Sequence, residues 1–170
     1  MRDFTMCPEC LAEYNDPMNR RFHAQPNACP VCGPHVELWN EKGEIVAQRN
    51  DAILLAVEFL RDGKIVAVKG IGGFHLMVDG TNEAAVQTLR KRKRREEKPF
   101  AMMVPSLEKV KQICFVSELE ERLLSSPESP IVLLRKGDAN SIIAPSVAPR
   151  NPSPGVMVPY SPLHHILLHE

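Results

Sequence analysis

The 170-residue sequence lacks three features that mark large classes of protein. It has no excess charge of either sign, because 21 lysines and arginines balance 21 aspartates and glutamates, and this argues against a surface that binds polyanions everywhere. No stretch approaches the roughly 18 consecutive apolar residues that a membrane-spanning helix needs. No apolar signal segment opens the sequence. We therefore expect a cytoplasmic protein with no membrane partner.

Proline is scarce only in the middle of the chain. The sequence has 15 prolines, about 9% of its residues against a usual level near 5%. Five lie in residues 1–34 and eight in residues 127–170, so that Pro99 and Pro105 stand alone between. This distribution divides the chain into three stretches, within a length typical of one domain with a small appendage.

Cysteine is nearly confined to the first stretch. Cys7 and Cys10 form one Cys-x-x-Cys pair, and Cys29 and Cys32 form a second, with 18 residues between them. Each pair aims two thiolates at one point, and two pairs complete the tetrahedral shell of four sulfurs that Zn²⁺ prefers. Disulfides and a redox pair are the alternatives, but an oxidising compartment is not indicated and Gly33-Pro34 breaks the helix that a redox pair normally starts.

The predicted zinc is structural, because a catalytic zinc would keep one position open for water. Residues 1–34 contain few large aliphatic side chains, so metal binding must supply the free energy that orders them. His23 could compete as a ligand, but four thiolates already fill the shell. The fifth cysteine, Cys114, lies in an apolar segment that indicates a buried thiol.

The rest of the sequence predicts alternating strands and helices. We expect a hairpin over residues 35–48 and strands over 64–69, 76–78, 100–104, 130–134 and 155–158. Helices are expected to begin after Asp51, after Thr81 or Asn82, after Ser106, after Ser117 with Glu120 as a capping box, and after Ser161. The pattern indicates an α+β or α/β domain on a mixed sheet with flanking helices. Residues 137–154 are expected to form a long functional loop.

A glycine cluster and a histidine follow the strand over 64–69. Gly70, Gly72 and Gly73 do not form a dinucleotide fingerprint, because a strand rather than a helix comes next. Two interpretations stay open: a plain turn between strands, or a turn whose backbone N–H groups approach an anion beside Lys69. His75 ends the cluster.

Six consecutive cations occupy residues 90–95, followed by Glu96, Glu97 and Lys98. They could form a solvated helix end that complements the helix dipole, a nucleic-acid patch, or a phosphate site. No aromatic residue interrupts the run, which argues against stacking on single strands. Downstream, His164 and His165 have no nucleophile beside them, so no catalytic residue is assigned.

Seven segments resemble the hydrogenase maturation carbamoyltransferases called HypF. Those similar to the family's second zinc-finger motif are residues 6–10, 13–17, 20–26 and 28–34. Those similar to its YrdC-like domain are residues 69–76, 89–101 and 155–165. The resemblance implies a zinc-finger module over residues 1–36 and a YrdC-like domain with a twisted mixed sheet over residues 37–170.

The resemblance also implies an activity. In the HypF family, carbamate released from carbamoyl phosphate is joined to ATP, with Mg²⁺, as carbamoyl adenylate. A further domain passes the carbamoyl group to the terminal cysteine of the partner HypE, for cyanide ligands of nickel–iron hydrogenases. The family's KxR motif falls on Lys93 and Arg95, with Arg92 and Arg94 as the alternative register. The remaining residues of the implied nucleotide site are Lys69, Gly72, Gly73, His75 and Lys98.

Some expectations follow from where the resemblance departs from the family. The sequence begins between the family's two zinc motifs and stops before the segment that closes the nucleotide pocket. We therefore expect an incomplete YrdC-like domain that does not complete the transfer alone. If each zinc were bound by cysteines from both of the family's zinc motifs, the four cysteines of this chain would not make a complete site. Because related YrdC enzymes form threonylcarbamoyl adenylate for tRNA, the alternative function is a zinc-stabilised RNA-binding module or a YrdC module of the threonylcarbamoyl-adenylate type.

Overall fold

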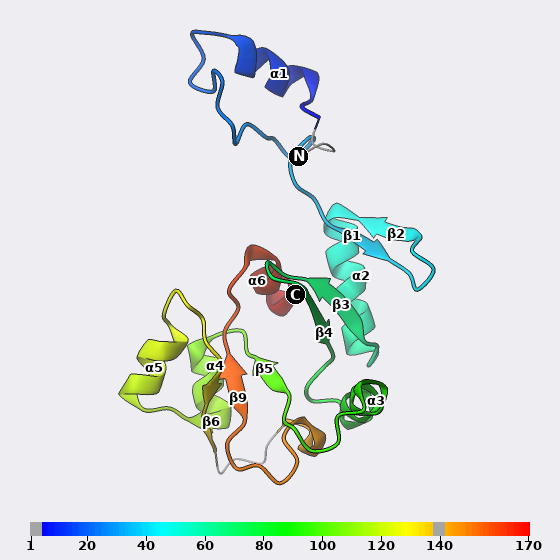
Figure 1. The fold of residues 1–170 in the computed structure, drawn as a ribbon, viewed down its shortest axis with the longest axis vertical. Helices are drawn as coiled ribbons and strands as arrows, with labels where there is room; N and C mark the ends of the chain where they lie inside the picture. The colour runs from blue at the N-terminus through cyan, green and yellow to red at the C-terminus, as the bar shows by residue number, and fades with distance from the viewer. Residues whose placement is uncertain (1–4, 138–141) are drawn as a thin grey trace. The chain divides into compact units, whose positions relative to one another are not determined.

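The computed structural model describes residues 5–137 and 142–170. It divides into two compact units, Met1–Ala52 and Ile53–Glu170 (Figure 1). Each unit mixes helices and strands, and the four cysteines of the two Cys-x-x-Cys pairs lie in the first. The predicted module boundary between residues 36 and 37 stays a prediction. None of the helices in the two described ranges combines the length and apolarity that crossing a bilayer requires.

The first unit opens with a helix that the sequence analysis did not predict. α1 (Pro8–Asn15) has Cys7 as its N-cap and Pro8 in its first turn. Proline is well tolerated there because the first N–H groups of a helix have no partner within the helix. The helix therefore begins inside the first Cys-x-x-Cys pair.

The predicted hairpin of the first unit is confirmed. β1 (Glu37–Trp39) pairs antiparallel with β2 (Ile45–Gln48). The side-chain oxygen of Asn40 accepts hydrogen bonds from the backbone N–H groups of Lys42 and Glu44. Asparagine thus closes the turn by replacing a backbone acceptor with its own side chain.

The helices that follow were largely located by their capping signals. α2 (Arg49–Arg61) begins at Arg49, slightly before the predicted cap at Asp51, and Gly63 follows it with φ +75°. Four more helices begin directly after the predicted caps Asn82, Ser106, Ser117 and Ser161, and each cap accepts a backbone hydrogen bond. They are α3 (Glu83–Lys93), α4 (Leu107–Ile113), α5 (Glu118–Leu124) and α6 (Pro162–His169).

An antiparallel hairpin carries the glycine cluster at its tip. β3 (Val66–Lys69) pairs with β4 (Phe74–Met77), so the second strand begins before the predicted range of 76–78. Val66 and Val68 are buried on one face, whereas Phe74 is exposed on the other. The strands alternate inward and outward, as expected for a hairpin packed on one side.

A three-stranded mixed sheet forms the centre of the second unit. β9 (Gly155–Met157) lies in the middle, parallel to β5 (Ala101–Met103) and antiparallel to β7 (Val132–Leu133). The predicted strands over 100–104, 130–134 and 155–158 are thereby confirmed in shorter form. A short ladder of β6 (Cys114–Phe115) and β8 (Arg135–Lys136) was not predicted.

The hydrophobic core of this unit lies between the mixed sheet and helices α4 and α5. It includes Val110, Leu124, Leu134 and Val156, none of which exposes more than 1% of its surface. Cys114 is packed into the same core, which confirms the predicted buried thiol.

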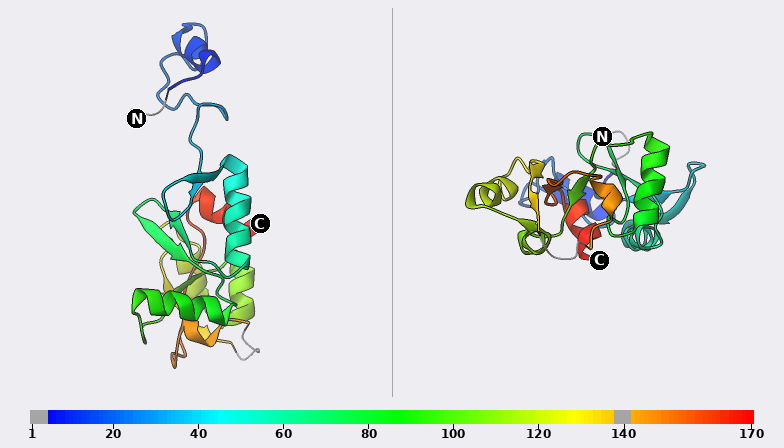
Figure 2. Two further views of the ribbon diagram at one scale, coloured as in Figure 1. Left: turned by 90° about the vertical axis from the view of Figure 1, so that its right-hand side faces the viewer. Right: turned by 90° about the horizontal axis from the view of Figure 1, so that it is seen from below.

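The predicted loop over residues 137–154 contains a short 3₁₀ helix, η1 (Pro145–Val147). η1 lies beside α3 in both Figure 1 and Figure 2. Its Val147 carbonyl accepts a hydrogen bond from the N–H of Phe100 (2.9 Å). Residues 138–141 of the predicted loop lie outside the described residues. The described part of the loop is thus tied to α3 and to the start of β5.

Candidate metal centre and anion-binding residues

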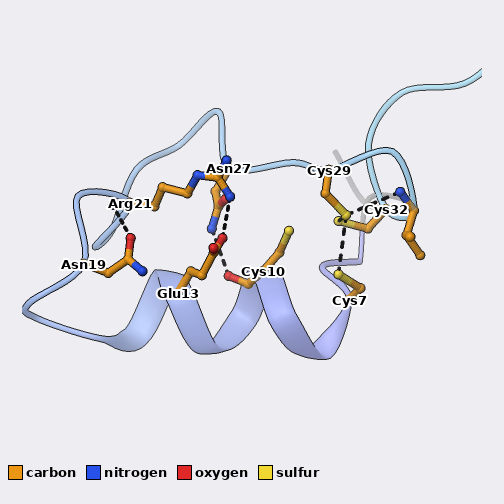
Figure 3. A network of polar contacts seen from close by, with 9 residues as sticks. Cys7, Cys10, Glu13, Asn19, Arg21, Asn27, Cys29 and Cys32 are labelled. Atoms are coloured by element: carbon orange, nitrogen blue, oxygen red, sulfur yellow. Dashed lines mark hydrogen bonds and ion pairs between the residues drawn. The ribbon is translucent and has the colours of Figure 1, made fainter.

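The four cysteines of the first unit converge on one point (Figure 3). The sulfur of Cys29 lies 3.7 Å from that of Cys7 and 3.8 Å from that of Cys32, and all four sulfurs lie within 4.8 Å of one another. Tetrahedral zinc with Zn–S bonds of about 2.3 Å requires sulfurs about 3.8 Å apart. The arrangement therefore fits the predicted zinc.

Backbone N–H groups favour the thiolate form in the second pair. The N–H of Val31 donates to the Cys29 sulfur (3.3 Å). Backbone hydrogen bonds from Cys32 and Val31 lower the pKa of Cys29, and those from Cys7 and Cys29 lower the pKa of Cys32 to about 6. Burial and the neighbouring thiols instead raise the pKa of Cys10. The lowered pKa values of Cys29 and Cys32 favour two thiolates at this point, and a bound cation would neutralise their negative charge.

Polar contacts frame the cysteines, and sequence reasoning missed them. The side-chain amide of Asn27, which is buried, donates to the carbonyl of Cys10 (2.8 Å). Glu13 and Arg21 form an ion pair at 2.5 Å (Figure 3). Arg49 donates to the carbonyls of Pro30 and Val31 in the second pair. These contacts fix the two turns that present the sulfurs.

His23 takes no part in the cysteine cluster. Its ring stacks on that of Tyr14, with centroids 4.9 Å apart and planes 4° from parallel. Among the described residues, the cluster of metal-ligating side chains consists of the four cysteines alone. His23 is an exposed loop residue, as the sequence analysis expected.

The glycine turn at the tip of the β3–β4 hairpin is closed by a hydrogen bond from the N–H of Gly70 to the carbonyl of Gly73 (2.7 Å). A Cβ at Gly70 would lie 3.0 Å from the hydroxyl of Tyr160 and 3.2 Å from the ring of His75. Gly72 has open space around it instead. The turn is therefore tight on one side and accessible on the other.

His75 belongs to a cluster of rings beneath that turn. Its Nε2 shares a hydrogen bond with the hydroxyl of Tyr160 (2.8 Å), and its ring lies 5.3 Å from that of His164. His164 is fully buried, and its Nδ1 lies 3.0 Å from the hydroxyl of Ser161. The cluster joins β4 to the N-terminus of α6.

The buried His164 should resist protonation. Its pKa is lowered from the ordinary value of 6.5 because burial, His75 and His165 all disfavour the imidazolium. We expect an NMR titration of this ring to have its midpoint below 6.5.

The lowered pKa of His164 also makes the stability of the fold depend on pH. Since the folded-state pKa is depressed, the contribution of His164 is present above pH 6.5 and is lost as the pH falls from there through the folded-state pKa. A His164→Phe variant, which cannot be protonated, should show a shallower fall in the free energy of unfolding over that range. A ring that titrates at or above 6.5 would contradict the expectation.

The predicted phosphate-binding residues lie at the end of α3 and in the turn after it. Lys93 is exposed in the last turn, and Lys98 is exposed beyond it. Arg94 is the C-cap, with φ 49°. Arg95 donates from Nε to the carbonyl of Lys98 (2.9 Å) and from Nη2 to that of Pro99 (2.6 Å). Part of the hydrogen-bonding capacity of Arg95 is therefore already used by backbone carbonyls.

Sequence reasoning missed that one cation of the run is different. Arg90 exposes only 8% of its surface, while the next four residues are all exposed. The sequence offers one signal for this difference, because Arg90 follows Val86 by four residues and so lies on the buried face of α3, but it does not show which groups bury the guanidinium. Within the described residues, no hydrogen bond or ion pair joins the basic run to Lys69, Gly72, Gly73 or His75. The assignment of both groups to one nucleotide site stays a prediction.

Two family models match the chain. Residues 6–39 match the HypF finger, and residues 58–170 match the Sua5, YciO and YrdC family, which is described as Telomere recombination. The carbamoyltransferase HypF of Rhodobacter capsulatus is 51% identical over 169 residues, which cover 99% of this chain and 22% of that protein.

Two solved structures are similar over the whole chain. HypF of T. kodakarensis superposes with a TM-score of 0.82 at 44% identity, over 100% of this chain and 22% of that one. A full-length HypF in a phosphate- and nucleotide-bound form gives 0.74 at 45% identity, over 99% and 22%. The chain thus spans about a fifth of the length of these relatives. It belongs to the Sua5, YciO and YrdC family, with a HypF finger in front of that domain as in the carbamoyltransferases HypF.

Proposed function

We propose that the chain is the zinc-finger and nucleotide-binding part of an ATP-dependent carbamoyltransferase of the HypF type. The observation that carries the proposal is the match of both family models in order along the chain. The phosphate and nucleotide bound to a relative at 45% identity support it. Zn²⁺ would be held by Cys7, Cys10, Cys29 and Cys32 and would supply folding free energy rather than catalysis.

In the proposed reaction, an oxygen of carbamate attacks the α-phosphorus of ATP, bound with Mg²⁺. The bond to the β-phosphate breaks, and pyrophosphate leaves carbamoyl adenylate behind. Carbamoyl phosphate supplies the carbamate, and a further domain delivers the carbamoyl group to a cysteine of a HypE partner. The chain's own contribution is to bind the phosphates and neutralise the charge of the departing pyrophosphate.

The cations in the last turn of α3 and in the turn after it are the residues that we propose for this role. Lys93 and Lys98 are exposed and can reach an anion, whereas Arg95 has two of its donor atoms engaged. The side chains of Arg92 and Arg94 make no hydrogen bond or ion pair with the described residues. Because Arg95 is partly engaged and these two side chains are not, the contacts favour the alternative register of the KxR motif, in which Arg92 and Arg94 bind the phosphates. Lys69, Gly72, Gly73 and His75 would form the opposite wall.

The test is carbamoyl-phosphate-dependent exchange between ATP and pyrophosphate, in a full-length HypF that contains this segment. Two double variants separate the registers: Lys93→Ala with Arg95→Ala, and Arg92→Ala with Arg94→Ala. Losing two charge-assisted phosphate contacts should slow exchange about a hundredfold in the register that binds.

Lys91→Ala is the matched control, because it removes one exposed cation of the same run and lies outside both registers. Its exchange rate should stay within about threefold of wild type. Wild-type exchange in both double variants would remove the basic run from the nucleotide site.

A further inference from the structure

Among the described residues, Arg90 is a buried charged side chain, and its guanidinium holds together two segments of backbone, the turn after α3 and η1. Nη1 donates to the carbonyls of Arg95 (2.8 Å) and Glu96 (3.1 Å). Both terminal nitrogens lie near the carbonyl of Lys98, at 3.3 and 3.4 Å. Arg90 therefore makes the turn after α3 fold back over its own side chain.

The same guanidinium anchors that turn to η1. Nε donates to the carbonyl of Ser146, and Nη2 to that of Val147 (3.1 Å). At the other end of α3, Glu83 accepts from the N–H of Ser146 (3.1 Å) and from its hydroxyl (2.5 Å). η1 is thus held by hydrogen bonds with two side chains of α3, one near each end of the helix, and the turn is attached to η1 through Arg90.

No carboxylate in the described part of the chain forms an ion pair with Arg90. None of the ion pairs in the described ranges includes it. Its contacts are carbonyl oxygens and the ring of Phe100, whose centroid lies 4.7 Å from the guanidinium carbon. Burial and the charge of Arg95 lower its pKa more than the charge of Glu83 raises it, but a guanidinium stays protonated in proteins. A buried positive charge with no ion-pair partner among the described residues therefore sits directly beneath the turn.

The carbonyls that Arg90 attracts also orient the amides of the turn. In a planar trans peptide, the C=O and N–H groups point in opposite directions. The carbonyls of Arg95 and Glu96 point at the guanidinium, so the N–H groups of Glu96 and Glu97 point away from it. Neither N–H donates to a hydrogen bond within the described residues. Two free backbone donors thus face outward on the side opposite the buried charge.

We propose that residues 94–98 form an anion-binding turn for a polyphosphate chain, and that Arg90 is its positioning residue. The turn would bind through the amides of Glu96 and Glu97 together with the side chains of Arg94 and Lys98. Residues 90–98 carry seven cations against two carboxylates, so the local charge favours an anion despite Glu96 and Glu97. Arg90 acts without touching the ligand. The inference rests on the proposed function and adds the backbone to its site.

The first test needs no mutation. Pyrophosphate and, separately, ATP are titrated at low salt into the 170-residue chain with zinc, and backbone amide shifts are followed by NMR. We expect the amides of Glu96 and Glu97 to shift in a saturable way with both ligands. Shifts at Gly72 and Gly73 without shifts at Glu96 and Glu97 would overturn the anion-binding turn and leave the proposed function standing. An absence of shifts with both ligands would overturn both.

The second test separates positioning from plain stability. Arg90→Lys keeps the charge but loses the planar fork that reaches several carbonyls at once. We expect pyrophosphate affinity to fall about tenfold, while dispersed amide signals elsewhere show a folded chain. The matched control Lys91→Met removes one exposed charge next to it and should change affinity by less than about threefold. Wild-type affinity in Arg90→Lys would overturn the role of Arg90.

Discussion

Removal of zinc is expected to unfold residues 5–34 and to leave the second unit folded. Among those residues, the only buried side chains are Cys10 and Asn27, so the segment has no hydrophobic core of its own. Structural zinc contributes about 10–16 kcal/mol of binding free energy in comparable small modules at neutral pH. Without it, the entropy of ordering some thirty residues is not offset.

The measurement combines zinc analysis with amide NMR. Wild type should hold one zinc per chain, and Cys32→Ser should hold far less and lose dispersed signals for residues 5–34. Cys114→Ser is the matched control: it alters a buried thiol in the other unit and should keep the zinc. Lowering the pH should also release zinc, because protons compete for the thiolates. Dispersed signals for residues 5–34 in a metal-free chain would contradict the assignment.

The second large effect is expected in the core of the second unit. Leu134 is fully buried among Val110, Leu124 and Val156, and its N–H donates to the carbonyl of Pro154 (3.0 Å). Truncation to alanine removes buried methyl groups and leaves a cavity, which in comparable cores destabilises by about 2–5 kcal/mol. Leu134→Ala should therefore lower the free energy of unfolding by that amount.

The neighbouring residue supplies the control. Leu133, in β7, is 68% exposed, so Leu133→Ala makes the same chemical change at the preceding residue without opening a cavity. It should change stability by less than about 0.5 kcal/mol. Urea unfolding of the second unit, followed by its amide signals, measures both variants. Equal losses of stability would show that Leu134 does not face the core.

The sequence predicted best what local chemistry decides. Asn82, Ser106, Ser117 and Ser161 cap their helices because each cap needs only a side-chain oxygen and an N–H a few residues away. The cysteine cluster was predictable for a related reason, since metal ligands come in spaced pairs.

The sequence could not predict what distant partners decide. Arg90 is buried because residues 146 and 147, far along the chain, supply carbonyls that its five neighbours in the run do not reach. The ring cluster beneath the glycine turn likewise depends on Tyr160 and His164 arriving from beyond β9. α1 was missed because the prolines and cysteines of its segment hid a short helix that starts at Cys7-Pro8.

The central place of β9 in the mixed sheet sets the order in which the chain can assemble. Each of the two hairpins, β1–β2 and β3–β4, joins neighbouring segments and can close as soon as it is synthesised. β5 and β7 are not bonded to each other and both pair with β9, so neither has its partner strand until residues 155–157 have emerged. During synthesis, the edge of β5 stays open while residues 104–154 are made, and that of β7 stays open while residues 134–154 are made. In that interval, the unpaired edges of β5 and β7 can pair with wrong strands, so misassembly is most favoured then.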